Sequence, residues 1–241
     1  MKIAVGSLAI GDVYRELMTP CIQTHKMYCE KHAYTYITDE SVYDGARPFS
    51  WYKIQLIKKY ISSYDYFVWL DADTIVWNDS VNIEELVKCM GDTSILCAHD
   101  LNNIKCGVII IKNTPYIMGI LDTIWDNTAF INHPWWEQAS LIDIYQHNEE
   151  CRKHIAIISQ EHCYRFNAYC NNLEPTSWIL HFAGMRDELL SSAIEQYSAS
   201  VKPHSLSVMY DFNILLSCDL PALDHHKGDD VLPVAPDMYD S

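Results

Sequence analysis

Two aspartates at the end of an apolar run are the residues of this 241-residue sequence best placed for chemistry. They are Asp71 and Asp73, within YDYFVWLDADTIVW at residues 64–77. On an extended strand, residues two apart point to the same side with Cα atoms about 6.6 Å apart, so both carboxylates could bind one ion. The simpler alternative is that the aspartates only end the strand and cap the following turn.

A histidine in a similar position is the best candidate for a third ligand. His181 follows the apolar residues WIL at 178–180, at the end of an expected strand. Oxygen ligands suit Mg²⁺ or Mn²⁺, and one imidazole among them favours Mn²⁺. Beyond it, Gly184 would allow the backbone to approach a phosphate, and Arg186 would supply a positive charge. The alternative for His181 is a hydrogen-bonded core histidine.

The charge balance limits which ligands the protein can bind. With a formal net charge of −15 at pH 7, the chain would repel nucleic-acid backbones and anionic membranes unless a local basic patch overrode the total. The densest basic run is the pair Lys58 and Lys59. We therefore expect no nucleic-acid partner, and a phosphate-bearing substrate would need a metal ion or a few well-placed cations.

Cysteine usage and hydropathy point to a reducing, aqueous compartment. The nine cysteines include no Cys-x-x-Cys pair, which favours reduced thiols. No run of about 18 apolar residues occurs, and IAVGSLAI at residues 3–10 is too short for a signal peptide or membrane anchor. We expect a soluble cytoplasmic protein without a membrane anchor, located in the host cytoplasm if the chain is viral.

The elements that must position these residues alternate between strands and helices, which indicates an α/β fold. The segment at 66–73 is apolar on both faces, as in the central strand of a parallel sheet covered by helices on both sides. Open α/β sheets bind ligands at the carboxyl ends of such strands. We expect the other strands at 2–9, 34–38, 94–98, 106–112, 155–159 and 177–183, and helices from 12, at 51–61, at 82–90, from 114 and at 132–146.

Composition changes near the C-terminus. Residues 1–217 carry the alternating pattern, and at this size a single domain is the better expectation. From Cys218, the stretch CDLPALDHHKGDDVLPVAPDMYDS is rich in Asp and Pro and lacks apolar periodicity. We interpret residues 218–241 as an acidic, proline-containing tail or a linker to further domains of a longer chain.

Four segments in a fixed order resemble a known enzyme family. They are FSWYKIQLIKKYISSYDYFVWLDADTIV, CGVIIIKNT, WWEQASL and ILHFAGM, which begin at residues 49, 106, 135 and 179. The first resembles the D-x-D segment of GT-A glycosyltransferases. Over about residues 1–190, the ordered set resembles glycosyltransferase family 34, the galactosyl, mannosyl and xylosyl transferases. It resembles family 8 more weakly. Two departures are Lys105-Cys106 in place of the usual Asn-x before Gly107, and Glu137 where Asp is commoner.

The resemblance implies a fold and a reaction. The fold would be GT-A, which is Rossmann-like, with a mixed, mostly parallel central sheet flanked by helices. The reaction would be transfer of a hexose-type sugar from a nucleotide-diphosphate donor, with a UDP-sugar favoured, to a glycan or glycoprotein acceptor. Asp71, Asp73 and His181 would hold Mn²⁺ or Mg²⁺, because a dication can neutralise the charge that grows on the departing diphosphate.

The nucleotide-sugar site would draw on several segments. The resemblance places Ser7, Leu8 and Tyr14 near the base, although Leu8 and Tyr14 could equally belong to the core. Lys53 begins a helix and could contact the diphosphate or the sugar, since helix starts and cations both favour anions; a solvated lysine is the alternative. The remaining candidates for the donor are Ala72, Gly184 and Arg186.

The sugar-side candidates lie together at residues 135–138. Trp135 and Trp136 would bind the acceptor, since aromatic faces stack on sugar rings, while Glu137 and Gln138 are the catalytic candidates beside the two aspartates. Both tryptophans could instead be core residues. Inversion would need a carboxylate base such as Glu137 or Asp187. Retention would need only a polar group such as Gln138 beneath the sugar, and the resemblance favours retention.

Two other functions fit parts of the same sequence. DADT satisfies the D-x-D-x-T signature of haloacid-dehalogenase-like phosphatases, in which Asp71 would be the nucleophile and Asp73 the acid. That motif normally lies on the first strand, and the later acidic pair of that family is matched only by KGDD at 227–230, which follows no expected strand. The third possibility is a non-catalytic module that binds a sugar nucleotide without turning it over.

Overall fold

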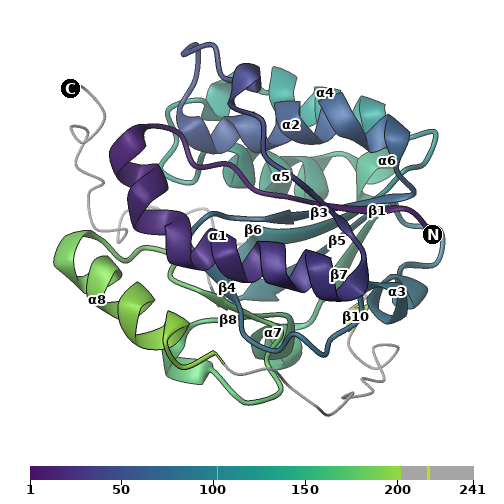
Figure 1. The fold of residues 1–241 in the computed structure, drawn as a ribbon. Coiled ribbons are helices and arrows are strands. Elements are labelled where there is room, and N and C mark those ends of the chain that lie inside the picture. Colours follow the sequence, from purple (N-terminus) through teal and green to yellow (C-terminus); the bar gives the residue numbers. More distant parts are fainter. Residues whose placement is uncertain (102, 202–215, 218–241) are drawn as a thin grey trace.

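The computed structural model describes residues 1–101, 103–201 and 216–217 (Figure 1). The expected tail at 218–241 lies outside the described residues. None of the described helices combines the length and the apolar character needed to cross a membrane.

The main sheet has seven strands in one layer. Their spatial order is β10 (Leu216–Ser217), β7 (Ile155–Ile158), β5 (Ile95–Asp100), β6 (Asn103–Lys112), β3 (Tyr66–Leu70), β1 (Ile3–Gly6) and β2 (Thr35–Ile37). Strands β6 and β10 run opposite to the other five. The expected α/β fold with a mixed, mostly parallel sheet is therefore confirmed.

A second, smaller sheet lies beside the carboxyl end of β3. It contains β4 (Thr74–Val76), β9 (Ile179–His181) and β8 (Asn167–Ala168), in that order. The second sheet matters because it carries His181, and because β4 directly follows the two aspartates.

Helices cover both faces of the main sheet (Figure 1). One face carries α2 (Tyr52–Tyr60), α4 (Ile117–Asp126) and α5 (Trp136–His147), and the other carries α1 (Asp12–His32). Helix α8 (Asp187–Ser198) packs beside α1 against the second sheet. The short helices are α3 (Ile83–Leu86), α6 (Glu149–Arg152) and α7 (Cys163–Phe166).

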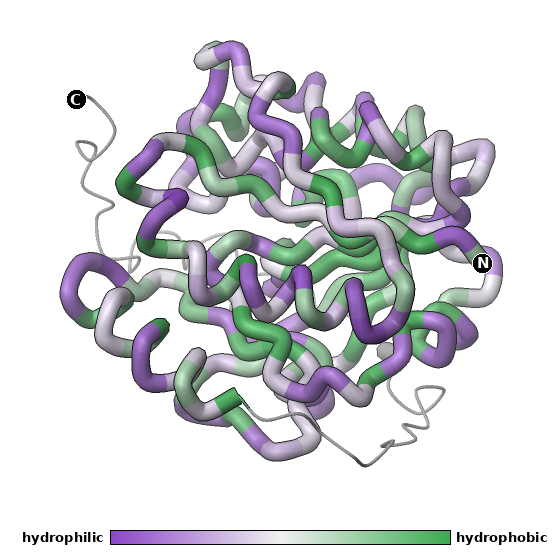
Figure 2. Tube along the Cα trace, in the orientation of Figure 1, coloured by the Kyte–Doolittle hydropathy of each residue, from purple (hydrophilic) through white to green (hydrophobic). Residues whose placement is uncertain are grey.

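Strand β3 shows why this layering follows from the sequence. Successive side chains of a strand point to opposite faces. Phe67 and Trp69 accordingly pack in the cluster under α2, α4 and α5, whereas Val68 and Leu70 pack in the cluster that contains residues of α1. Figure 2 shows the hydrophobic residues concentrated along these central strands. The expectation that this strand is buried on both faces is therefore confirmed.

The strand is shorter than expected, and this changes the placement of the aspartates. We expected one strand over 66–73, but β3 ends at Leu70 and the chain turns through residues 71–73 into β4. The Asp71 amide still donates to the Gly107 carbonyl oxygen at 2.8 Å, which is the last bond to β6. The Thr74 hydroxyl then donates to the Asp71 carbonyl oxygen at 2.7 Å and closes the turn.

Other boundaries also differ from the sequence pattern. The helix expected over 132–146 begins only at Trp136, and the strand expected over 177–183 is confined to Ile179–His181. Helix α8 and strand β8 were not anticipated. The sequence of β8 is short and that of α8 is mixed in polarity. Contacts with distant segments, rather than a local pattern, therefore determine where these two elements form.

Candidate functional site

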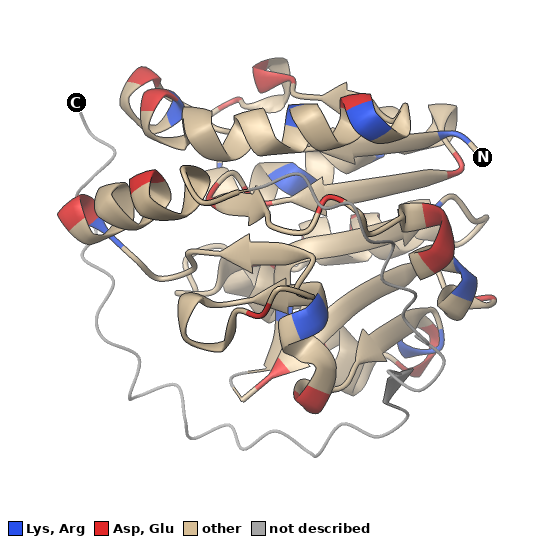
Figure 3. Cartoon of the chain, turned by 60° about the horizontal axis from the view of Figure 1, so that its bottom comes forward, with Lys and Arg blue, Asp and Glu red and all other residues tan. Residues whose placement is uncertain are grey.

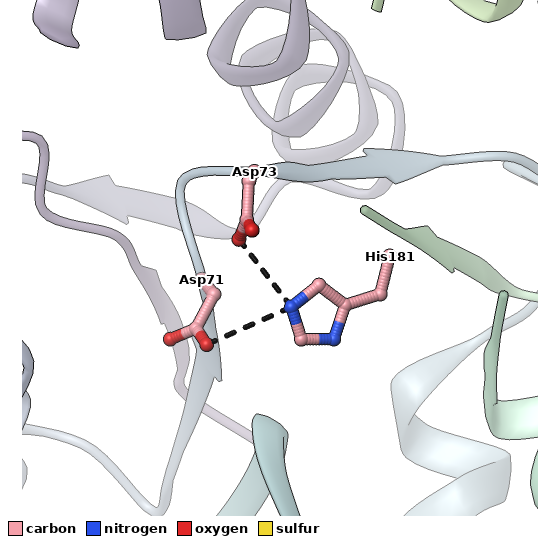
Figure 4. A group of neighbouring side chains, drawn as sticks. All are labelled: Asp71, Asp73 and His181. Carbon is pink, nitrogen blue, oxygen red and sulfur yellow. Dashed lines mark ion pairs between the residues drawn. The ribbon is translucent and has the colours of Figure 1, made fainter. Parts of the chain in front are cut away.

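Asp71, Asp73 and His181 converge at the edge where β3 ends (Figure 4). One ligand atom of each residue lies within 4.8 Å of the other two. Nε2 of His181 is 3.3 Å from Asp73 Oδ1 and 3.8 Å from Asp71 Oδ2. Their side chains thus point toward a common point, although the aspartates lie on a turn and not on a strand.

Pairing between β4 and β9 within the second sheet creates this convergence. Thr74, the first residue of β4, is the antiparallel partner of His181 in β9. The amide of Phe182 donates to the Asp73 carbonyl oxygen at 3.0 Å, which ties the turn to the end of β9. Backbone hydrogen bonds therefore bring the aspartates and the histidine together, although they are far apart in the sequence.

Gly107 in β6 makes room for the imidazole. A Cβ atom at position 107 would lie only 2.1 Å from His181 Cε1 and 2.5 Å from Nδ1. On another side, the ring of Tyr169 stacks on the His181 ring with centroids 6.4 Å apart. Among the described residues, Nδ1 of His181 has no hydrogen-bond partner, so packing holds the ring on that side.

The donor set fits a hard divalent cation. Two carboxylates and one imidazole nitrogen are a combination that Mn²⁺ accepts, and Mg²⁺ accepts the oxygens. The side chains of Asp71 and Asp73 are 28% and 21% exposed, so the site is open to solvent on one side. Burial acts to raise the pKa of Asp73, but the neighbouring His181 outweighs it and holds that pKa below its usual value, so the carboxyl is ionised.

Lys53 links Asp71 to Glu137 in a buried ion network. Its ammonium nitrogen lies 3.0 Å from Asp71 Oδ1, 2.7 Å from Glu137 Oε1 and 3.1 Å from the Cys106 carbonyl oxygen. Burial alone would lower the pKa of Lys53, but the two carboxylates raise it above its usual value. An ammonium group has three donors, and here protein atoms occupy all three.

Several residues of the network were missed by sequence reasoning. The indole of Trp69 donates to Asp71 Oδ1 at 2.6 Å, and the Ser50 hydroxyl donates to Glu137 Oε2. Ser50 and Glu137 are far apart in the sequence, so no local pattern links them. Gly107 belongs to CGVIIIKNT, one of the segments that carry the family resemblance. Its steric role depends on His181 and is visible only in the structure.

The first turn of α5 places Glu137 and Gln138 beside Lys53 and Cys106. Gln138 Oε1 accepts a hydrogen bond from the Cys106 amide at 3.3 Å, and Glu137 is buried beside Lys53. Trp136 has a positive φ of 45°, which is a genuine outlier for a bulky residue and costs backbone energy. Trp135 and Trp136 are both partly exposed and pack against the cluster under α2, α4 and α5.

The candidate residues that follow β1 lie at the same edge of the main sheet as the aspartate turn. Gly6 is the partner of Trp69, so Ser7 and Leu8 emerge beside the start of the aspartate turn. Ser7 is fully buried and Leu8 is partly buried against the core. Tyr14 packs partly buried against the cluster that also contains the buried Ala72.

The candidates that follow β9 are exposed. Gly184 has a φ of 77°, a conformation that favours glycine, and it lies three residues after His181. Arg186 is exposed at the start of α8. In Figure 3 the basic residues are scattered over several of the drawn elements and do not gather in one place.

Two family models match the chain. The model described as the galactosyl transferase GMA12/MNN10 family matches residues 85–189, which contain Glu137 and His181. A model described as a protein of unknown function, DUF273, matches residues 25–134, which contain both aspartates of the turn. A comparison with curated protein sequences found no match.

Solved structures share the fold. A glycosyltransferase involved in the glycosylation of the major capsid of PBCV-1 is 15% identical, with a TM-score of 0.64 over 81% of this chain and 100% of that chain. The apo-form glycosyltransferase GlyE of Streptococcus pneumoniae TIGR4 is 16% identical, with a TM-score of 0.50 over 82% of this chain and 60% of that chain. At these identities the likeness concerns the fold.

These comparisons agree with the family resemblance noted in the sequence. The chain has the GT-A fold, and over residues 85–189 its sequence is similar to the galactosyl transferase GMA12/MNN10 family.

Proposed function

We propose that this protein transfers a hexose-type sugar from a UDP-sugar to a glycan or glycoprotein acceptor, with retention of configuration and with Mn²⁺ or Mg²⁺ as cofactor. The observation that carries the proposal is the convergence of Asp71, Asp73 and His181, whose ligand atoms lie within 4.8 Å of one another. When bound there, the dication would neutralise the negative charge that grows on the departing diphosphate. A chain of net charge −15 would otherwise repel an anionic donor, and such an ion offsets that repulsion.

In this proposal Lys53 orients Asp71 rather than binding the donor directly. All three donors of its ammonium group are taken by Asp71, Glu137 and the Cys106 carbonyl oxygen. Contact with a diphosphate would require one of these bonds to break. Together with the Trp69 indole, Lys53 engages Oδ1 of Asp71 and leaves Oδ2 on the side of His181.

The surroundings of Glu137 support retention over inversion. A general base must reach the acceptor hydroxyl. Glu137 is buried, and its two oxygens are engaged by Lys53 and Ser50. Gln138 is freer: its Oε1 accepts from the Cys106 amide, while its amide nitrogen has no acceptor among the residues that the structure describes. We assign Gln138 as the polar group beneath the transferred sugar and Glu137 as the anchor of Lys53.

The remaining assignments follow the edge of the sheet. The base and ribose would lie along Ser7, Leu8 and Tyr14, with Ser7 contributing its backbone because its side chain is buried. The diphosphate would lie against Ala72, Gly184 and Arg186. The acceptor would lie against Trp135 and Trp136. The cysteines that the structure describes are all free thiols, which fits a reducing compartment such as the cytoplasm.

A thermal-shift screen of UDP- and GDP-sugars, with and without Mn²⁺, tests the proposal. Ligand binding stabilises the native state by RT ln(1 + [L]/Kd), about 2.7 kcal/mol at a hundred times Kd. We expect one UDP-sugar to raise the melting temperature only when Mn²⁺ is present, and to be hydrolysed slowly. Asp71→Asn and Asp73→Asn should each remove the Mn²⁺-dependent part of the shift.

Two outcomes would support the other functions instead. Release of phosphate from aryl phosphates, abolished by Asp71→Asn and without any response to sugar nucleotides, would indicate a phosphatase. The later acidic pair that a phosphatase needs, at 227–230, lies outside the described residues. Binding of a sugar nucleotide without hydrolysis or transfer to any acceptor would indicate a binding module.

A further inference from the structure

A buried histidine of α1 contacts the aspartate turn from behind. His25 is fully buried, and its Nε2 lies 2.8 Å from the Thr74 carbonyl oxygen and 2.9 Å from the Thr74 hydroxyl oxygen. Thr74 directly follows Asp73 and begins β4. His25 is not among the residues assigned to the donor, the metal or the acceptor. The proposed function therefore gives its contact with Thr74 no role.

The hydrogen-bond network determines which nitrogen of His25 carries the proton. The Thr74 hydroxyl donates its only proton to the Asp71 carbonyl oxygen, at 2.7 Å. Toward His25 it can therefore only accept, and the Thr74 carbonyl oxygen can only accept as well. Nε2 must be the donor in both contacts, which assigns the tautomer from the network. Burial lowers the pKa of His25 to about 4, which agrees with a neutral ring at neutral pH.

A chain of three groups thus joins α1 to the aspartates. Nε2–H of His25 holds Thr74, and the Thr74 hydroxyl holds the carbonyl oxygen of Asp71. The preceding residue of α1, Thr24, accepts a hydrogen bond from the Val76 amide at 3.0 Å. Two consecutive residues of α1 therefore fix the first and last residues of β4.

We propose that His25 is a positioning residue for the metal-binding turn, acting through Thr74 on the backbone that carries Asp71 and Asp73. The turn needs such support because residues 71–73 lie outside any strand ladder. Its other backbone bonds are those from the Asp71 amide to Gly107 and from the Phe182 amide to the Asp73 carbonyl oxygen. A hydrogen bond from a rigid helix fixes the turn before an ion arrives, and lost preorganisation weakens binding. The inference rests on the proposed metal site.

The test compares two substitutions that place an amide nitrogen differently. The amide nitrogen of Gln falls near the position of Nε2, whereas that of Asn falls near the position of Nδ1. We expect His25→Gln to keep the Mn²⁺ affinity, measured by electron paramagnetic resonance, within about threefold of the wild type. His25→Asn should weaken it by about tenfold or more, the usual effect of losing a group that orients a metal ligand.

His32 provides a matched control in the same helix. Its Nε2 contacts the Asp79 carbonyl oxygen at 2.8 Å, so it makes the same kind of bond to the same downstream segment, away from the turn. His32→Asn should lower the melting temperature without changing the Mn²⁺ affinity. Thr74→Val removes the hydroxyl that links His25 to Asp71, and should weaken Mn²⁺ binding even if His25→Asn fails to fold.

A metal-free measurement separates this inference from the proposed function. Hydrogen exchange of the Asp71 amide, which is bonded to Gly107, should be faster in His25→Asn than in the wild type and unchanged in His25→Gln and His32→Asn. Equal exchange in all variants would overturn the inference, as would a wild-type Mn²⁺ affinity in His25→Asn. A wild type that binds no Mn²⁺ would instead overturn the proposed function, whatever the exchange rates.

Discussion

Replacing Gly107 with alanine should disable the proposed metal site while leaving the fold intact. The added Cβ would lie 2.1 Å from His181 Cε1, and ordinary contact begins at 3.4 Å, so the imidazole must retreat by about 1.3 Å. Metal–ligand distances tolerate only about 0.2 Å. We expect the Mn²⁺ affinity to fall at least a hundredfold, which corresponds to about 2.7 kcal/mol.

The backbone should accept the same change. Gly107 lies within β6 and is not in the left-handed region. In a strand interior, alanine is favoured over glycine by roughly 0.5–1 kcal/mol, which partly offsets the steric strain. Thermal unfolding should therefore remain cooperative, so that a loss of Mn²⁺ binding cannot be attributed to unfolding.

Two further variants make the assay specific. Gly119→Ala in α4 introduces a Cβ with no atom within 4 Å, and should leave Mn²⁺ affinity unchanged while stabilising the helix by about 1 kcal/mol. His181→Ala and the double variant with Gly107→Ala should bind Mn²⁺ equally poorly, because both changes act on one ligand. Wild-type Mn²⁺ affinity in Gly107→Ala, measured by calorimetry or paramagnetic resonance, would refute the steric reasoning.

The ion network and the buried histidine give two more predictions. Lys53→Met leaves Glu137 buried without a cation and should lower the free energy of unfolding by about 3–5 kcal/mol in urea titrations; adding Glu137→Gln should recover part of this, and no recovery would argue against an ion pair. The pKa of His25 lies near 4 in the folded state, below its ordinary value of 6.5, so the unfolded chain binds the extra proton between these values. The free energy of unfolding should therefore fall as pH drops from 6.5 toward 4, by at most about 1.4 kcal/mol per pH unit. His25→Gln should flatten this dependence, and an identical slope in both proteins would contradict it.

The turn at residues 71–73 shows where sequence reasoning succeeded for the wrong geometric reason. The pattern of Asp71 and Asp73 predicted two carboxylates that face one point, and the structure brings them together. The expected cause was the two-residue repeat of a strand, yet β3 ends before Asp71. The convergence instead comes from a turn held by the Thr74 hydroxyl and by the bond from Phe182 to Asp73.

The buried ion network was out of reach of any local pattern. Lys53 begins α2, and a cation at a helix start predicts contact with an anionic ligand. In the structure its partners are Asp71 and Glu137, delivered by different elements. Which charges become buried together depends on how the elements pack. Spacing along the chain carries no information about such long-range pairs.

The sequence alone determined the layered α/β architecture, because hydrophobic periodicity reports which faces of a strand or helix must leave water. It also identified Asp71, Asp73 and His181, because such residues at the ends of apolar runs emerge at one edge of a sheet. Only the tertiary structure decided how these groups are held: the space that Gly107 leaves for the imidazole, the support of the turn by His25, and the engagement of Lys53 by two carboxylates. The reason is physical, since contacts of a few ångströms between distant segments arise from packing and hydrogen-bond geometry.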